Sequence, residues 1–205
     1  MKTKAPPSIR RSSSRPGEPT WEVAQFYPPQ GEWTEADYLG LQTNHLIELS
    51  DGFLEVLPMP THKHQMILAF LYGLLKAFVE QHAPGTVLFA PLRMRLWEGK
   101  FREPDLLYMR QEHQDRIHDY WEGADLVMEI VSPGTAEHDL DTKRDEYAKA
   151  RIPEYWIVDV IAKQITVLML GKNKYRVHGV FGPGTQADSK LLAGFSVDVD
   201  QVLAI

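Results

Sequence analysis

The run Ala124–Val131 restricts the fold of this chain more than any other segment. Its apolar residues occupy both faces of an extended chain, which is typical of a strand buried inside a sheet. Alternation puts Glu129 on the same face as Val127 and Val131. The run stops at Ser132-Pro133-Gly134, which breaks regular structure. We therefore expect a central strand that carries one acid in its interior.

Helical and extended patterns alternate around this strand. Thr34 predicts a helix cap, and the Asp51-Gly52 pair between apolar runs predicts a hairpin turn. The expected helices cover 33–41, 62–82 and 138–150, and the expected strands cover 45–49, 53–57, 87–97, 101–109, 124–131, 155–160 and 165–170. This order predicts an α/β sandwich in which helices flank a mixed sheet, with an N-terminal β-hairpin.

Charge is divided unevenly along the chain. The formal net charge is −6, and residues 1–15 carry five Lys and Arg without an acid, so the remainder is strongly acidic. Such a body lacks the basic footprint that nucleic-acid-binding proteins usually have. We expect residues 1–20 to form a disordered basic tail and residues 21–205 to form a single domain.

Composition excludes several classes of protein. The chain has no cysteine, which rules out disulfides, a cysteine nucleophile and a thiolate metal site. No apolar stretch is long enough for a membrane span, and the N-terminus lacks the apolar core of a signal peptide. A cytoplasmic protein is therefore the expectation.

Three charged residues carry the chemical signal. Asp105 follows Pro104 within a strand pattern, where proline marks a strand start or a bulge, although a turn or cap acid is equally consistent. Glu129 in an apolar strand needs a partner or a cation. Lys143 shares a helix face with Leu140 and Tyr147, although pairing with Asp139 would also explain it. Carboxylates suit Mg²⁺ as oxygen ligands, and a lysine can stabilise charge developing on phosphorus, so the set predicts phosphodiester hydrolysis.

Two further side chains are secondary candidates. His64 lies on the apolar face of the helix over 62–82, where it is either a packed core histidine or a site residue. Glu48, just before the hairpin turn, either adds a carboxylate to the metal cluster or is solvated. His62 and His64 form His-x-His, but no further zinc ligands follow at a suitable spacing, which disfavours zinc.

The chain resembles the restriction-endonuclease-like family, long a domain of unknown function, within the PD-(D/E)xK nuclease superfamily. The segments that carry the resemblance span roughly residues 33–200: Ile47-Glu-Leu-Ser-Asp-Gly52, Pro58-Met-Pro60 with His64-Gln65, Arg102-Glu-Pro-Asp105, Leu126-Val-Met-Glu-Ile-Val-Ser-Pro133, Asp139 with Lys143 and Tyr147, and Pro153-Glu-Tyr-Trp-Ile-Val-Asp159. Each motif alone is weak, whereas the ordered set is fairly specific.

The resemblance implies a Mg²⁺-dependent endonuclease acting on nucleic acid, with DNA as the expected substrate, in which Mn²⁺ can substitute. Asp105 and Glu129 would be the metal ligands, with the carbonyl of Ile130 as a third and Glu48 as an addition. Lys143 would be a displaced catalytic lysine, because the superfamily's usual position two residues after Glu129 holds Val131. His64 would lie near the site. A homodimer is implied because two strands need two sites.

Two other functions remain open at this stage. A non-catalytic binding or assembly module with a decayed site is favoured by the acidic body and by Val131. A glycosidase using the acid pair is a third, weaker reading. The coexistence of Asp105, Glu129 and Lys143 favours the nuclease, because a decayed site should lose costly buried charges.

Overall fold

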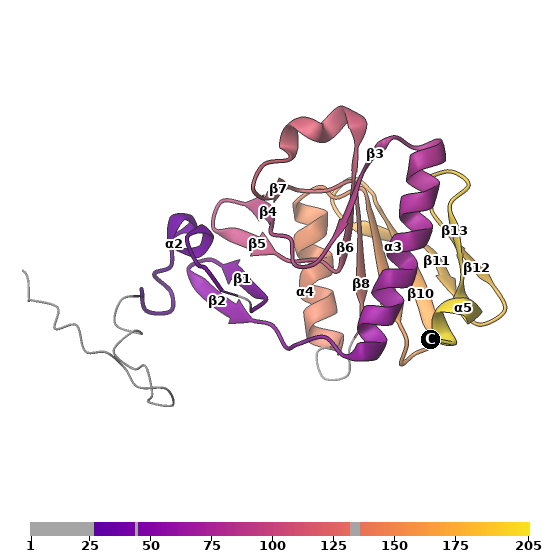
Figure 1. Cartoon of the computed structure of the whole chain (residues 1–205), viewed down its shortest axis with the longest axis horizontal. Helices are drawn as coiled ribbons and strands as arrows, with labels where there is room; N and C mark the ends of the chain where they lie inside the picture. Colours follow the sequence, from indigo (N-terminus) through magenta and orange to yellow (C-terminus); the bar gives the residue numbers. More distant parts are fainter. Residues whose placement is uncertain (1–26, 44, 132–135) are drawn as a thin grey trace, which may run out of the picture.

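A computed structural model describes residues 27–43, 45–131 and 136–205 (Figure 1). The tail expected over residues 1–20 lies outside these residues. The helices are α2 (Glu35–Leu39), α3 (His62–His82), the 3₁₀ helix η1 (Gln111–Arg116), α4 (Ala136–Lys149) and α5 (Val199–Leu203). In the described part of the chain, no helix is long and apolar enough to cross a membrane.

The larger sheet has six strands in the order β11-β10-β9-β8-β6-β3. They are β3 (Gly85–Phe89), β6 (Leu106–Arg110), β8 (Leu126–Ile130), β9 (Glu154–Asp159), β10 (Gln164–Leu170) and β11 (Tyr175–Phe181). Only β8 and β9 pair in parallel, so the sheet is mixed as predicted. All five residues of β8 are buried, which confirms the central strand.

One long helix covers each face of this sheet. The apolar stripe of α3 packs on the face of β8 that carries Leu126, Met128 and Ile130. The other face of β8 carries Val127, which packs in a second core with Tyr147 of α4. Glu129 therefore lies on the α4 side, as alternation predicted. The helix-flanked mixed sheet is confirmed.

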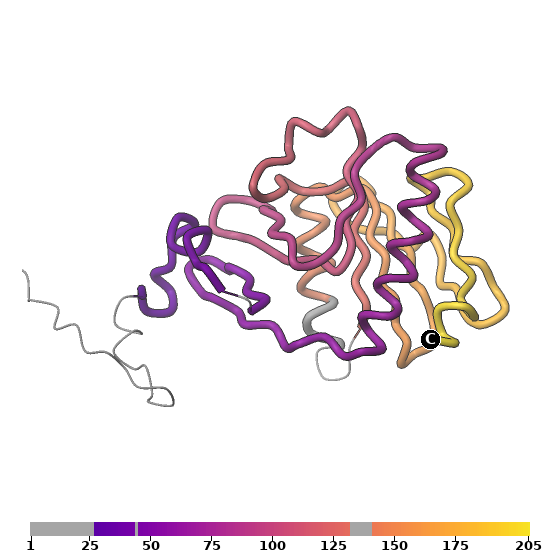
Figure 2. The backbone as a smooth tube through the Cα atoms, in the orientation of Figure 1, coloured from indigo at the N-terminus to yellow at the C-terminus, as the bar shows by residue number. Residues whose placement is uncertain are grey.

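A smaller sheet forms a lobe beside the larger one, in the order β2-β1-β5-β4-β7 (Figure 2). Its strands are β1 (Ile47–Ser50), β2 (Phe53–Val56), β4 (Met94–Trp97), β5 (Lys100–Arg102) and β7 (Trp121–Glu122). The predicted hairpin is β1 and β2. Helix α2 begins at Thr34, whose hydroxyl caps it in a capping box with Asp37. Tyr38 of α2 packs on Phe101 of β5 in the core of this lobe.

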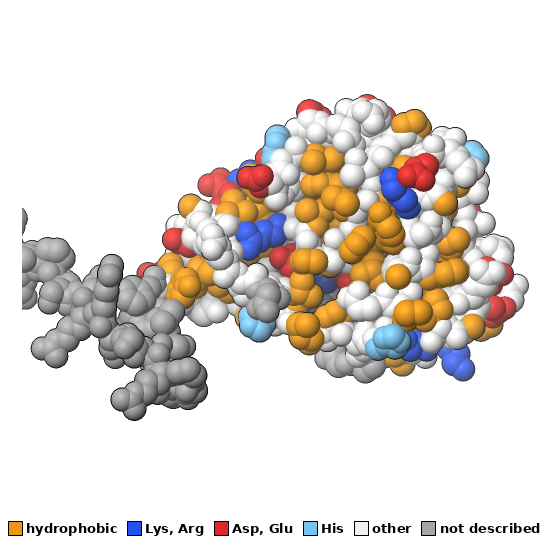
Figure 3. Space-filling view, in the orientation of Figure 1, with side chains coloured by type: hydrophobic (Ala, Val, Ile, Leu, Met, Phe, Trp, Pro, Cys, Tyr) orange, Lys and Arg blue, Asp and Glu red, His pale blue; other side chains and the backbone are white. Residues whose placement is uncertain are grey.

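Two predicted strands were wrong because each contains a proline that ends pairing. The segment 87–97 is split at Pro91 into β3 and β4, which belong to different sheets. Val87 is the buried residue of β3, whereas Leu88 is exposed. Figure 3 shows apolar side chains across the face that carries α3 and β3. The segment 101–109 is split at Pro104 into β5 and β6, which leaves Asp105 just before a strand.

The C-terminal part adds β12 (Gln186–Asp188), β13 (Ser196–Asp198) and α5. The fully buried carboxylate of Glu154, at the start of β9, ties this part to the sheet. It accepts hydrogen bonds from the indole N–H of Trp156 (2.7 Å), the hydroxyl of Ser189 (2.6 Å) and the backbone N–H groups of Lys190 and Leu191 (2.8 Å each). Four donors thus satisfy one buried acid.

Candidate active site

Strand register brings Asp105 and Glu129 together. Leu106 of β6 pairs with Met128 of β8, so the next position outward sets Asp105 opposite Glu129. Opposed residues in an antiparallel pair project from the same face with Cβ atoms about 5 Å apart. Asp105 accepts the backbone N–H of Ile130 and contacts His64 of α3, while Glu129, the residue before Ile130, contacts α4, so the two acids are neighbours at the same end of the sheet. The sequence did not reveal this register, since it depends on the break at Pro104.

Two donors hold one oxygen of Asp105. The backbone N–H of Ile130 lies 2.7 Å from Asp105 Oδ2, and Nε2 of His64 lies 3.1 Å from the same atom. No described residue donates a hydrogen bond to Oδ1, and the side chain is 16% exposed. Asp105 is thus oriented through one oxygen while the other remains open to a ligand.

His64 reaches Asp105 from the first turn of α3. Thr61 caps this helix, and its hydroxyl accepts the backbone N–H of His64. Burial lowers the pKa of His64, but the hydrogen bond and charge of Asp105, with Glu129 behind it, outweigh burial and raise the pKa above its usual value. His64 is therefore a buried partner of Asp105, and its role in a catalytic site stays a prediction.

Replacing Thr61 with Ala should lower the free energy of unfolding by about 1 kcal/mol, because the first turn of α3 loses its cap. Urea unfolding measures this change. Thr61→Ser retains the capping hydroxyl and should leave stability nearly unchanged. Equal losses in both variants would contradict the capping role.

Two donors from α4 hold the carboxylate of Glu129. The phenol of Tyr147 donates to Oε1 at 2.6 Å, and Nζ of Lys143 lies 3.2 Å from Oε2. Lys143 and Tyr147 are one helical turn apart, so they reach the same acid. Burial raises the pKa of Glu129 to about 7, Asp105 adds to this, and Lys143 and Tyr147 oppose it. The predicted inward face of α4 is confirmed at Lys143 and Tyr147, while the side chain of Leu140 lies outside the described residues.

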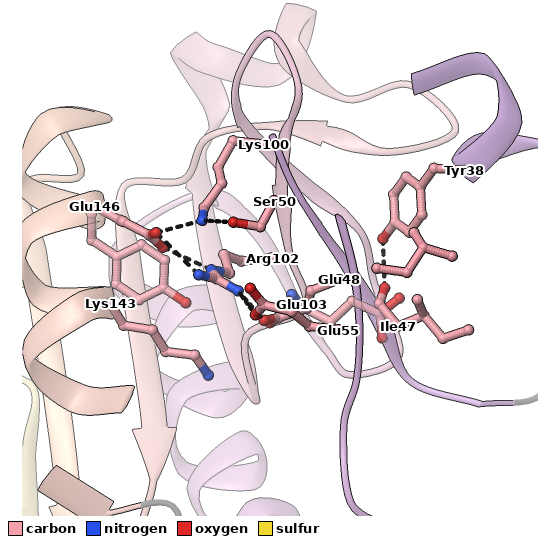
Figure 4. Close-up of polar contacts among 12 residues, drawn as sticks. Tyr38, Ile47, Glu48, Ser50, Glu55, Lys100, Arg102, Glu103, Lys143 and Glu146 are labelled. Carbon is pink, nitrogen blue, oxygen red and sulfur yellow. Dashed lines mark hydrogen bonds and ion pairs between the residues drawn. The ribbon is translucent and has the colours of Figure 1, made fainter. Parts of the chain in front are cut away.

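Glu48 takes part in a separate buried ion network (Figure 4). Its Oε2 accepts from Arg102 Nη1 at 2.5 Å, and its Oε1 accepts the backbone N–H of Glu103 at 2.9 Å. Arg102 also binds Glu55 (2.7 Å) and both oxygens of Glu146 on α4 (2.7 and 3.0 Å). The charge of Glu48 still raises the pKa of Glu129, but its oxygens already have donors.

Lys100 extends this network to α4. Its Nζ lies 2.6 Å from the hydroxyl of Ser50 and 2.5 Å from Glu146 Oε1. Burial opposes ionisation of Glu146, but hydrogen bonds from Arg102 and Lys100 outweigh it and lower the pKa of Glu146. We call Glu48, Glu55, Lys100, Arg102 and Glu146 the lobe clamp, because they join the smaller sheet to α4.

Of the clamp residues, sequence reasoning singled out only Glu48, as a metal ligand, while Arg102 and Glu103 appeared only in the segment Arg102-Glu-Pro-Asp105. Burial raises the pKa of Glu103 to about 7 and the charge of Glu48 adds to this, while Arg93 opposes it. Oε2 of Glu103 is buried and has no hydrogen-bond partner among the described residues. The available signal was the run Lys100–Glu103, which places three charged residues in or directly after a short strand. Burying charged side chains costs free energy unless they are paired, so partners for them were to be expected.

The donor set at Asp105 and Glu129 fits a hard divalent cation. Mg²⁺ commonly uses one or two carboxylates and keeps several waters. Oδ1 of Asp105 is open, and the neighbouring carboxylate of Glu129 already contacts Tyr147 and Lys143, so a cation would share its oxygens with these donors. Within the described ranges, no three His, Asp or Glu side chains gather as a ready-made metal cluster. A cation here would therefore be held by two acids, main-chain oxygen and water.

The structure thus brings Asp105, Glu129, Lys143 and His64 to one place. Glu48 lies near them but is bound by Arg102 and Glu103. His62, considered with His64 for zinc, has an exposed side chain at the start of α3. Tyr147 is the additional residue that contacts the acid pair.

Comparison with known proteins identifies what this arrangement resembles. The Uma2 family model, described as "Putative restriction endonuclease", matches residues 25–200. The crystal structure of a "putative nuclease" from Anabaena variabilis is 16% identical, with a TM-score of 0.71 over 84% of this chain and 98% of that chain. No curated protein matches the chain. At this identity the structural match shows a shared fold, which agrees with the predicted restriction-endonuclease-like architecture.

Proposed function

The chain belongs to the Uma2 family of putative restriction endonucleases, and from that premise we propose that it is a metal-dependent nuclease that hydrolyses phosphodiester bonds, in DNA in the first instance. The observation that carries the proposal is that Asp105 is bound to the backbone next to Glu129, with Lys143 bound to Glu129. A protein without catalytic use for these charges would gain little from keeping them buried.

Each residue has a role in this proposal. Asp105 and Glu129 would hold Mg²⁺, with the carbonyl of Ile130 as a third ligand, and the ion would supply charge for the phosphoryl oxygens and an acidified water. The N–H of Ile130 and the ring of His64 keep Asp105 oriented. Lys143 would stabilise charge developing on phosphorus, and Tyr147 fixes the rotamer of Glu129.

Removal of divalent metal should abolish cleavage. We expect the purified chain to nick supercoiled plasmid with Mg²⁺ or Mn²⁺ and to stop completely in excess EDTA, because the acids alone supply neither charge stabilisation nor an activated water. Agarose electrophoresis of plasmid and of a matched RNA separates the two substrates. Stable nucleic-acid binding without cleavage under any divalent metal would instead support a binding module.

We also propose that the nuclease acts as a homodimer, since double-strand cleavage needs two sites. Sedimentation equilibrium should give twice the chain mass of 23.5 kDa. A monomer at all concentrations would reject this part of the proposal and leave single-strand nicking as the reaction.

A further inference from the structure

Two adjacent hollows lie at the end of α4 that is remote from the acid pair. The first, about 330 Å³, lies between β4, η1, β7 and the C-terminal end of α4. The second, about 420 Å³, lies between α4 and the turn joining β10 to β11. Arg151 lines both, so they adjoin. In Figure 1 η1 and β7 lie toward the top, opposite the first turn of α3.

Four cations without ion pairs surround these hollows. Arg116 lines the first, Lys149 and Lys174 line the second, and Arg151 lines both. All four are exposed, and none forms an ion pair with a carboxylate in the described ranges. By contrast, the site cations Lys100, Arg102 and Lys143 are all neutralised. We call Arg116, Lys149, Arg151 and Lys174 the basic groove.

The acids of the same hollows are largely engaged elsewhere. Asp125 is buried and accepts from the backbone N–H of Arg110 and from the ring of His113. Glu122 faces Arg95 at 3.8 Å. Asp145 is the remaining acid of the second hollow. The groove therefore keeps local positive charge on a body whose sequence is strongly acidic.

Arg151 occupies a backbone position that suits glycine better. It follows α4 with φ of +66°, a left-handed conformation that costs a side-chain-bearing residue about 1 kcal/mol. Its Nη1 donates to the carbonyl of Lys172 at 2.5 Å. The bond anchors the guanidinium at the boundary of the two hollows, where its remaining N–H groups can meet an anion.

We propose that the basic groove is a second nucleic-acid contact site, which binds the phosphate backbone away from the cleavage centre. The inference rests on the proposed nuclease function, which supplies a polyanionic substrate. A small anion would need one enclosed pocket, whereas adjoining open hollows with successive cations suit a repeating chain of phosphates. Asp125, which lines the first hollow, lies four positions before Glu129 along β8, a rise of about 13 Å, so the two contacts involve different parts of the substrate.

Removing groove cations should weaken binding in a salt-dependent way. We expect Arg151→Gly with Lys174→Ala to weaken affinity for a 40-base-pair duplex about tenfold and to lower the slope of log K against log salt by about 2. Adding Arg116→Ala to this double variant should lower the salt slope by about 1 more. Fluorescence anisotropy without divalent metal measures both, on DNA and on RNA of the same sequence. Metal-dependent hydrolysis of bis(p-nitrophenyl) phosphate, a single phosphodiester too small to reach the groove from the acid pair, should stay unchanged.

The matched control is Lys163→Gly with Lys190→Ala. These exposed lysines lie outside the groove, and Lys163 also has a positive φ of 56°, so the pair reproduces both the charge change and the backbone change. The basic residues of the first fifteen positions are common to all variants. An unchanged slope in the groove variants, with metal-dependent cleavage intact, overturns the groove and leaves the nuclease standing. A wild-type chain that neither binds nor cuts nucleic acid overturns both.

Discussion

Asp105→Asn and Glu129→Gln should each reduce metal-dependent cleavage about a thousandfold or more, while leaving nucleic-acid binding in place. Each substitution removes one carboxylate charge from the pair that would hold the cation, and keeps the shape of the side chain. Asparagine at 105 can still accept the N–H of Ile130, and glutamine at 129 can still accept the phenol of Tyr147. The loss should therefore appear in the cleavage rate rather than in folding or affinity.

Single-turnover cleavage of plasmid measures the rate, and thermal unfolding checks that each variant is folded. Asp119→Asn is the matched control, because Asp119 is exposed and makes no side-chain hydrogen bond to a described residue. It should cleave at the wild-type rate. Cleavage by Asp105→Asn within tenfold of wild type would remove the proposed metal ligand and, with it, the mechanism.

Glu154→Ala should destabilise the protein by about 3–5 kcal/mol, the largest stability change that we expect from a single substitution. The side chain is fully buried and accepts four hydrogen bonds, so its removal leaves the indole of Trp156, the hydroxyl of Ser189 and two backbone N–H groups unsatisfied. The turn after β12 would lose its attachment to β9. For a chain of this size the midpoint of thermal unfolding should fall by about 10 °C.

Urea unfolding of three variants tests this role. Glu154→Gln keeps one carbonyl acceptor and should lose less stability than Glu154→Ala, because part of the network survives. Asp119→Ala, at an exposed position, should lie within about 0.5 kcal/mol of wild type. A loss below 1 kcal/mol for Glu154→Ala would mean that water satisfies these donors as well as the carboxylate does.

The elements that follow from local pattern were predictable. The apolar spacing of α3 gave its bounds, the Asp51-Gly52 turn gave the hairpin, and the two-faced apolar run gave the central strand. The predictions failed at Pro91 and Pro104, where periodicity continues across a break in hydrogen bonding. A period of two describes side-chain direction, but it does not report which strand is the partner.

The candidate site was predictable as residue types rather than as contacts. Glu129 and Lys143 stood out because each is a charge in an apolar pattern, and the structure pairs them at 3.2 Å. The contact of His64 with Asp105 joins residues 41 positions apart, which no local pattern can reveal. Arg102 and Glu146 were missed because charged residues on a short strand and on an amphipathic helix usually face solvent.

The lobe clamp affects how a mutational scan of this protein is interpreted. Glu146 lies three residues after Lys143 on α4. The bonds of Arg102 and Lys100 to Glu146 therefore help to fix the rotation of α4 about its axis, and with it the direction in which the Lys143 side chain points. Loss of turnover after substitution of Glu48 or Arg102 would thus be expected whether or not either group touches the reacting phosphate. Only a comparison of cation affinity between such variants and Asp105→Asn separates a misaligned helix from a missing ligand.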